Sequence, residues 1–173
     1  MRLLVVLCFL SSVNQFNRST PLNREIVVRY PNLATGEEAE LIRETTSLTG
    51  YDYRIKIGKR YISDAYPDIT SFQWSPDGKH FYFLVQDYPS FDDFVVQDGK
   101  AHYRSFDIIG QIQWSQKSDQ LVYFGILNHK SDCWQAIVMW NGIPMQTVSG
   151  PMSFLFDESD QLVVEGAVAP STY

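Results

Sequence analysis

Two kinds of hairpin recur along this chain with the same period, and this repetition constrains its fold more than any other feature. In the stretch FQWSPDGKHFYF, residues 72–83, apolar and polar residues alternate up to Trp74, and an aromatic strand begins after a polar turn. The turn is Ser75-Pro76-Asp77-Gly78, in which proline presets φ, aspartate bonds nearby backbone N–H groups and glycine accepts the exit geometry. Similar stretches contain Trp114 and Phe156, and the sequence numbers of the three aromatic residues increase by 114 − 74 = 40 and 156 − 114 = 42.

A second marker, a glycine in a tight turn, keeps the same period. The sequence numbers of Gly58, Gly99 and Gly142 increase by 99 − 58 = 41 and 142 − 99 = 43. The dipeptides Asp98-Gly99 and Asn141-Gly142 favour type I′ hairpin turns, because both central residues of such a turn need a positive φ. Each repeat unit is therefore predicted to contain an outer hairpin closed by the glycine turn and an inner hairpin closed by the aspartate turn.

The length of the unit indicates the fold. Four strands in about 40–45 residues is the period of a β-propeller blade. The sequence therefore predicts an all-β fold, a β-propeller-like array of four-stranded antiparallel blades, with repeat cores near residues 51–83, 94–124 and 134–168. We expect Trp74, Trp114 and Phe156 at equivalent positions in their units.

The best-preserved turn is also similar to that of a known repeat family. WSPDGK, residues 74–79, resembles the signature of TolB-type, WD-repeat-like propeller blades. FVVQDGK, from Phe94 to Lys100, resembles bacterial propeller repeats, and the segment from Arg24 to Leu41 resembles the outer hairpin of the same family. The likeness covers most of residues 24–168. It implies a propeller fold and leaves the function open, since such propellers act as scaffolds, as partners of receptors or transporters, and as gates on peptidases.

The repeats are fewer than in a closed propeller. Three units are clear, whereas closed propellers have about 4–8 blades. Residues 1–45 could supply most of a fourth unit, with LLVVLCFL, REIVVRY and AELIRE as strands and with a strand preferred to a short helix over Glu37–Thr46. We therefore expect an incomplete array whose open edges either pair with a second copy, giving a homo-oligomer, or are sealed by the chain termini.

The N-terminal segment, residues 1–15, allows two interpretations. Met1-Arg2, an apolar run and Ser11-Ser12 form the pattern of a short signal peptide, which predicts a secreted or periplasmic protein. The alternative is that this segment forms a strand of the first blade in a cytoplasmic protein. The apolar run is too short to span a bilayer, so no membrane insertion is expected. In either case residues 16–173 are predicted to form a single propeller-like domain.

The charge and the motifs argue against several functions. Fourteen Lys and Arg residues against twenty Asp and Glu residues give a net charge of −6, which argues against a nucleic-acid surface. The sequence contains no Gly-x-Ser-x-Gly elbow, phosphate-binding loop, Cys-x-x-Cys or His-x-x-x-His, and its three histidines fall at different offsets within the repeat. We therefore expect no catalytic residue, no metal site and no cofactor.

The candidate binding residues lie in the predicted connections between the second and third strands of two units. Such connections emerge on the same side of a repeat array, and loops carry binding residues on a fixed scaffold. Aromatic and charged residues together are typical of interface hot spots. The predicted partner-binding residues are Tyr88, Phe91, Asp92, His129 and Trp134. The alternative is that Phe91 and Trp134 pack between blades.

These features favour two functions from different classes. The first is a non-catalytic propeller-type module that binds a protein or peptide partner. The second is the propeller portion of a larger prolyl-oligopeptidase-like hydrolase, in which it gates access of the substrate to a catalytic domain absent from these residues. A third possibility, a small molecule bound at the axis of the propeller, requires convergent polar groups that the sequence alone does not locate.

Overall fold

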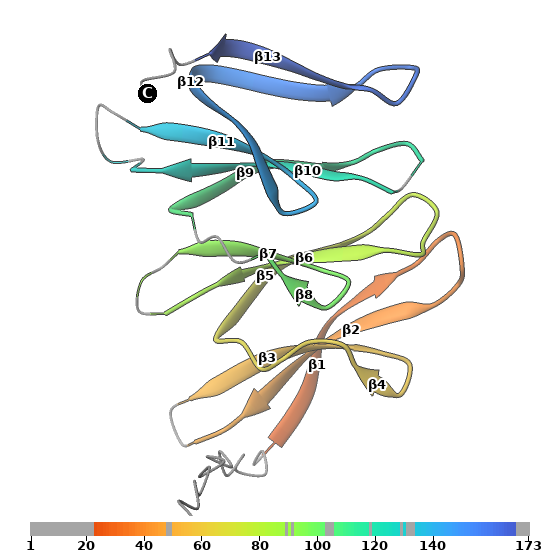
Figure 1. The fold of residues 1–173 in the computed structure, drawn as a ribbon. Helices are drawn as coiled ribbons and strands as arrows, with labels where there is room; N and C mark the ends of the chain where they lie inside the picture. Colours follow the sequence, from red (N-terminus) through yellow and green to blue (C-terminus); the bar gives the residue numbers. More distant parts are fainter. Residues whose placement is uncertain are drawn as a thin grey trace, which may run out of the picture.

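Every regular element of the described chain is a β-strand (Figure 1). The computed structural model describes residues 23–47, 50–88, 90, 92–102, 106–117, 119–128, 130 and 134–168. Within these residues the all-β prediction is confirmed, and Glu38–Thr45 is a strand as expected. The described part contains no helix long and apolar enough to cross a membrane. The two interpretations of residues 1–15 concern residues outside the described ranges.

Consecutive strands form antiparallel sheets, which are stacked one after another in Figure 1. The first sheet contains β1 (Asn23–Pro31), β2 (Glu38–Thr45), β3 (Tyr51–Ile57) and β4 (Arg60–Tyr61). The second contains β5 (Asp68–Trp74), β6 (Phe81–Gln86), β7 (Asp93–Gln97) and β8 (Lys100–Ala101). The third contains β9 (Ile108–Trp114), β10 (Leu121–Leu127), β11 (Gln135–Trp140), β12 (Ile143–Phe156) and β13 (Leu162–Val168).

The long strand β12 belongs to two blades. Its beginning, from Ile143 to Val148, pairs with β11, whereas the part from Val148 to Phe156 pairs with β13. β12 is therefore both the fourth strand of the third blade and the first strand of the next hairpin. The described chain forms three four-stranded blades and one further hairpin, a propeller-like array in which the first and last sheets lie at opposite ends (Figure 1).

The turn between the first and second strands is built in the same way in every blade. In each turn one backbone N–H donates to a backbone carbonyl on the other side of the turn, at 2.8–2.9 Å. The donor and acceptor residues are Asn32 and Glu37, Ser75 and His80, Ser115 and Gln120, and Asp157 and Gln161. The sequence numbers of these donors increase by 75 − 32 = 43, 115 − 75 = 40 and 157 − 115 = 42. Trp74, Trp114 and Phe156 directly precede three of the donors, so their predicted equivalence is confirmed.

The glycine turns also have the expected geometry. Asp98 and Gly99 have φ values of 49° and 78°, and Asn141 and Gly142 have 47° and 79°, as type I′ turns require. The Oδ1 atoms of Asp98 and Asn141 also accept a hydrogen bond from the first backbone N–H of the second strand, at 3.0 and 2.7 Å. A side-chain oxygen at this position therefore links the glycine turn by a hydrogen bond to the second strand of the same blade.

The grouping of the hairpins differs from the prediction. The predicted units combine each glycine-turn hairpin with the hairpin that follows it, but β3 and β4 share a sheet with β1 and β2, which precede them. The first sheet boundary therefore falls inside the predicted unit 51–83. The prediction that Arg24–Leu41 forms an outer hairpin is wrong, because this segment supplies the first two strands of a blade. A period in the sequence does not define where each repeat begins.

The core consists of three apolar clusters, one between each pair of neighbouring sheets or hairpins. Phe83 and Val85 of β6 face Leu41 and Ile55 of the first sheet, whereas Tyr82, on the opposite face of β6, belongs to the cluster with the third sheet. The second sheet is thus buried on both faces, which explains the continuous apolar run FYFLV in β6. The third cluster joins β10 and β11 to the last hairpin.

Candidate functional site

The predicted binding residues lie in the connections β6–β7 and β10–β11. Both connections join the second strand of a blade to its third, as expected. The strand ends that flank them lie on the same side of the array, on the left in Figure 1. Phe91 and His129 lie outside the described residues. The arrangement of the described strands therefore agrees with a common side for these loops, and partner binding stays a prediction.

The three described members of this set differ in exposure. The side chain of Tyr88 is 45% exposed, and its hydroxyl lies 3.4 Å from Gln86 Oε1. Asp92 is half-buried and its carbonyl accepts a hydrogen bond from the backbone N–H of Asp87 at 2.9 Å. Trp134 is half-buried and packs against the cluster between β10, β11 and the last hairpin. Trp134 therefore has a packing role, whereas Tyr88 is the most exposed of the three.

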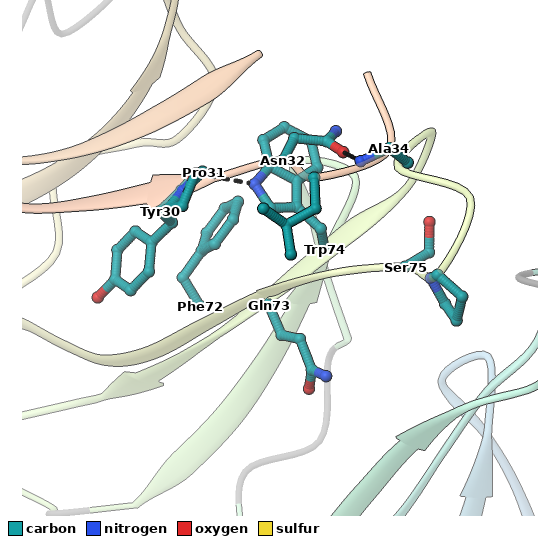
Figure 2. A pocket seen from close by; sticks show the side chains of 10 residues that line it. Tyr30, Pro31, Asn32, Ala34, Phe72, Gln73, Trp74 and Ser75 are labelled. Carbon is teal, nitrogen blue, oxygen red and sulfur yellow. Dashed lines mark hydrogen bonds between the residues drawn. The ribbon is translucent and has the colours of Figure 1, made fainter. Parts of the chain in front are cut away.

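A cleft of about 340 Å³ lies on the opposite side, where β1 and β5 end (Figure 2). Tyr30 stacks on Phe72 with ring centroids 5.0 Å apart, and Phe72 meets Trp74 edge-to-face at 5.2 Å. Leu33 lies at the cleft with 95% of its surface exposed. The ten residues that line the cleft are Tyr30, Pro31, Asn32, Leu33, Ala34, Phe72, Gln73, Trp74, Ser75 and Pro76.

The polar groups of this cleft bond to other groups of the chain. Trp74 Nε1 donates to the carbonyl of Tyr30 at 3.0 Å, which joins β5 to β1. Asn32, only 2% exposed, donates from Nδ2 to the carbonyl of Gly78 at 2.7 Å and accepts from the backbone N–H groups of Ala34 and Thr35. These bonds hold the two turns together and leave mainly apolar and aromatic surface facing the cleft.

The adjacent turn is rigidified by its own side chains. Ser75 Oγ donates to Asp77 Oδ1 at 2.7 Å and accepts from the backbone N–H of His80 at 3.0 Å. The hydrogen bond from Ser75, together with that from the backbone N–H of Lys79, lowers the pKa of Asp77 below its ordinary value. The Ser-Pro-Asp-Gly turn thus forms a fixed wall beside the cleft.

A second, more polar groove of about 780 Å³ lies near the glycine turns of the second and third blades. His102 packs on Gly142 and shares a hydrogen bond of 3.0 Å with the hydroxyl of Tyr123. Burial lowers the pKa of His102 and raises that of Tyr123. Across the described ranges, no three His, Cys, Asp or Glu side chains are grouped so as to hold a metal ion.

Sequence reasoning did not identify the cleft of Figure 2 as a candidate site. Trp74 was recognisable as a marker of the repeat, and Tyr30 and Leu33 lie in the segment Arg24–Leu41 that resembles a family hairpin, but neither pattern indicates a cleft. The cleft is formed by two blades, and its walls come from residues about one repeat apart, such as Tyr30 and Trp74. Only the exposed leucine in a turn, at LATGEE, could have indicated an apolar surface there.

Comparison with known proteins gives a likeness to two solved structures. No protein-family model matches the chain, and no curated protein matches it. The β-propeller domain of the Trilobed protease from Pyrococcus furiosus is 15% identical with a TM-score of 0.49, covering 81% of this chain and 48% of that one. An acylaminoacyl peptidase from Pyrococcus horikoshii is 14% identical with a TM-score of 0.44, covering 85% of this chain and 28% of that one. The chain spans about half the length of the first structure and less than a third of the second.

Proposed function

We propose that this chain is a non-catalytic propeller-type module that binds a peptide segment of a partner protein. The observation that supports this most is the aromatic cleft between β1 and β5, with Leu33 95% exposed beside it. An exposed leucine gains about 1.5–3 kcal/mol when a partner removes it from water. Because Asn32 and Trp74 already bond within the chain, the cleft favours an apolar side chain of a peptide over a polar small molecule.

The test is a selection of peptides from a random library on the full chain, followed by affinity measurements with fluorescence-labelled peptides. We expect the selected peptides to contain an aromatic or aliphatic anchor and to bind Leu33→Ser at least tenfold more weakly. Leu33 is almost fully solvated in the free chain, so this substitution should leave the unfolding transition unchanged. Selection of no peptide, or equal binding to the variant, would contradict the proposed site.

The two sides of the array can be separated in the same assay. Tyr88→Ala replaces an exposed residue on the side of the β6–β7 loop. Leu33→Ser replaces an exposed residue on the opposite side, at the cleft. Loss of binding only in Tyr88→Ala would assign the function to the predicted loop site that includes Asp92 and Trp134. Loss only in Leu33→Ser assigns it to the cleft.

The alternative function, a substrate-gating portion of a prolyl-oligopeptidase-like hydrolase, stays a second proposal. It differs from the first because it requires a catalytic domain joined to this array. Determining the full reading frame around these 173 residues separates the two, since a hydrolase domain in the same frame would favour the gating function.

A further inference from the structure

The first strand of the array is unusually exposed for its position in a blade. Like β5 and β9, the first strands of the next two blades, β1 has a neighbour on one side only among the described strands, but its residues from Asn23 to Arg29 are all exposed. Ile26 is 43% exposed, whereas the equivalent residue one repeat later, Ile69 of β5, is 4% exposed. Val27 and Val28 are also 44% and 40% exposed. Three consecutive aliphatic residues on an edge strand form a surface suited to pairing with another strand.

The backbone of this edge can accept a further strand over a limited length. The N–H of Asn32 donates to the carbonyl of Glu37 at 2.8 Å, which fixes the alternation of hydrogen-bonded pairs along β1 and β2. Arg29, paired with Glu40, therefore directs its N–H and C=O away from β2. Pro31 has no N–H, so the donor edge ends at Arg29. The bulge between Ile26 and Val28 locally bends the strand.

The side chains of β1 define the chemistry of such a strand. On the face turned away from the second sheet, Arg24, Ile26 and Arg29 lie opposite Glu44, Ile42 and Glu40 of β2. Arg24 Nε is 2.8 Å from Glu44 Oε1, and Arg29 Nη2 is 3.4 Å from Glu40 Oε1. β2 thus places acidic residues two positions on either side of an isoleucine.

The same arginines also face the open side of the strand. The side chains of Arg24 and Arg29 remain 54% and 56% exposed while paired with β2. A strand added at the free edge and aligned across the bulge as β2 is would place its side chains beside the same Arg–Ile–Arg set, because neighbouring strands align side chains on each face. Acidic side chains flanking an aliphatic one would therefore complement β1 on its second side as β2 does on its first.

We infer that the free edge of β1 binds an extended segment of a partner protein by strand addition, and that this segment carries acidic residues two positions on either side of an aliphatic residue. The inference rests on the proposed function and names the chemistry of the peptide. The cleft of Figure 2 begins where β1 ends, at Tyr30 and Pro31. One peptide could therefore pair with β1 and place an apolar anchor in the cleft.

The experiment titrates the full chain with three labelled eight-residue peptides. The first has a central isoleucine with glutamate two positions before and after it, the second has lysines in place of the glutamates, and the third is the first with alternate backbone amides N-methylated. We expect the acidic peptide to bind at least tenfold tighter than either of the others. Equal affinities for all three would overturn the inference.

Two variants and one exchange measurement complete the test. Arg29→Ala should weaken the acidic peptide about three- to tenfold, whereas Arg60→Ala, at the opposite edge of the same sheet, should not. The amide of Arg29 should exchange with solvent rapidly in the free chain and slowly with the acidic peptide bound. Protection of this amide in the free chain would show that residues 1–22 or a second copy already cover the edge, and would overturn the inference.

The outcome separates this inference from the proposed function. Library-selected peptides whose binding depends on Leu33 but not on Arg29 would support the proposed peptide-binding function and overturn the inference of strand addition at β1. If no library peptide binds while the acidic peptide binds in an Arg29-dependent way, strand addition is supported and the cleft is not the binding site.

Discussion

Asn32 joins the first two blades, and its substitution tests whether the turns hold neighbouring sheets together. Its Nδ2 atom donates to the carbonyl of Gly78 at 2.7 Å, a residue of the next blade. Its Oδ1 atom accepts from the N–H groups of Ala34 and Thr35 at 3.1 and 3.2 Å. One side chain thus makes one bond between blades and two bonds within its own turn, and different substitutions can remove these separately.

The expected magnitudes follow from the burial of each partner. Gly78 is buried, so its carbonyl loses its partner without gaining water, at a cost of about 1–2 kcal/mol. Ala34 and Thr35 are exposed, so water replaces most of what their N–H groups lose, and the two bonds together cost about 1 kcal/mol. Asn32→Ala should therefore lower the free energy of unfolding by about 2–3 kcal/mol, and Asn32→Ser by about 1–2 kcal/mol. Serine keeps a side-chain acceptor in the turn. Ser75 and Ser115, at the same position of the next two blades, accept from the N–H groups of His80 and Gln120 across their turns.

The assay is urea unfolding of the full chain, followed by tryptophan fluorescence. Trp74, one of four tryptophans in the chain, lies in the same cleft and donates to the carbonyl of Tyr30, so part of the emission change reports separation of the first two blades. We expect the order wild type, Asn32→Ser, Asn32→Ala in decreasing stability. An Asn32→Ser variant as stable as wild type would refute the role of the bond to Gly78, and one as unstable as Asn32→Ala would refute the separate contribution of the turn.

Two further predictions concern the glycine turns and the histidine beside them. Gly142 and Gly36 have similar φ values of +79° and +77°, but a Cβ on Gly142 would lie 2.7 Å from the His102 ring, whereas one on Gly36 would meet no atom within 4 Å. Gly142→Ala should therefore cost about 2–4 kcal/mol and Gly36→Ala about 1 kcal/mol in denaturant unfolding, and equal costs would contradict the packing of His102. Burial lowers the pKa of His102 below 6.5, so the unfolded chain binds more protons in this range and stability should fall as the pH decreases below about 6.5. Unfolding midpoints at several pH values should show this loss in the wild type and less of it in His102→Gln; an identical pH dependence would contradict the burial of a neutral imidazole.

The local hairpins could be predicted from the sequence because their causes are local. Positive φ at Asp98-Gly99 and Asn141-Gly142 and the turn at Ser75–Gly78 depend on residues adjacent in the chain. Alternation and β-branched content then predict the flanking strands. The repeat period followed from the same markers, and with it the four-stranded architecture.

The candidate sites could be predicted only in part. The loops with Tyr88 and Trp134 connect second and third strands as expected, but the packing of Trp134 on the third cluster depends on residues of β10 and the last hairpin. The cleft between Tyr30 and Trp74 was not predicted, because the sequence does not state which surfaces of successive blades meet.

The sequence by itself determined the hairpins, their period and the all-β class, since backbone φ preferences and strand patterning act over a few residues. Only the tertiary structure decided which hairpins share a sheet, why Ile26 is exposed while Ile69 is buried, and where the cleft opens. These features depend on contacts between residues about one repeat apart, such as Asn32 and Gly78. Equivalent strands of the repeats have similar local preferences, so the different environments of Ile26 and Ile69 arise from the neighbours that each blade packs against.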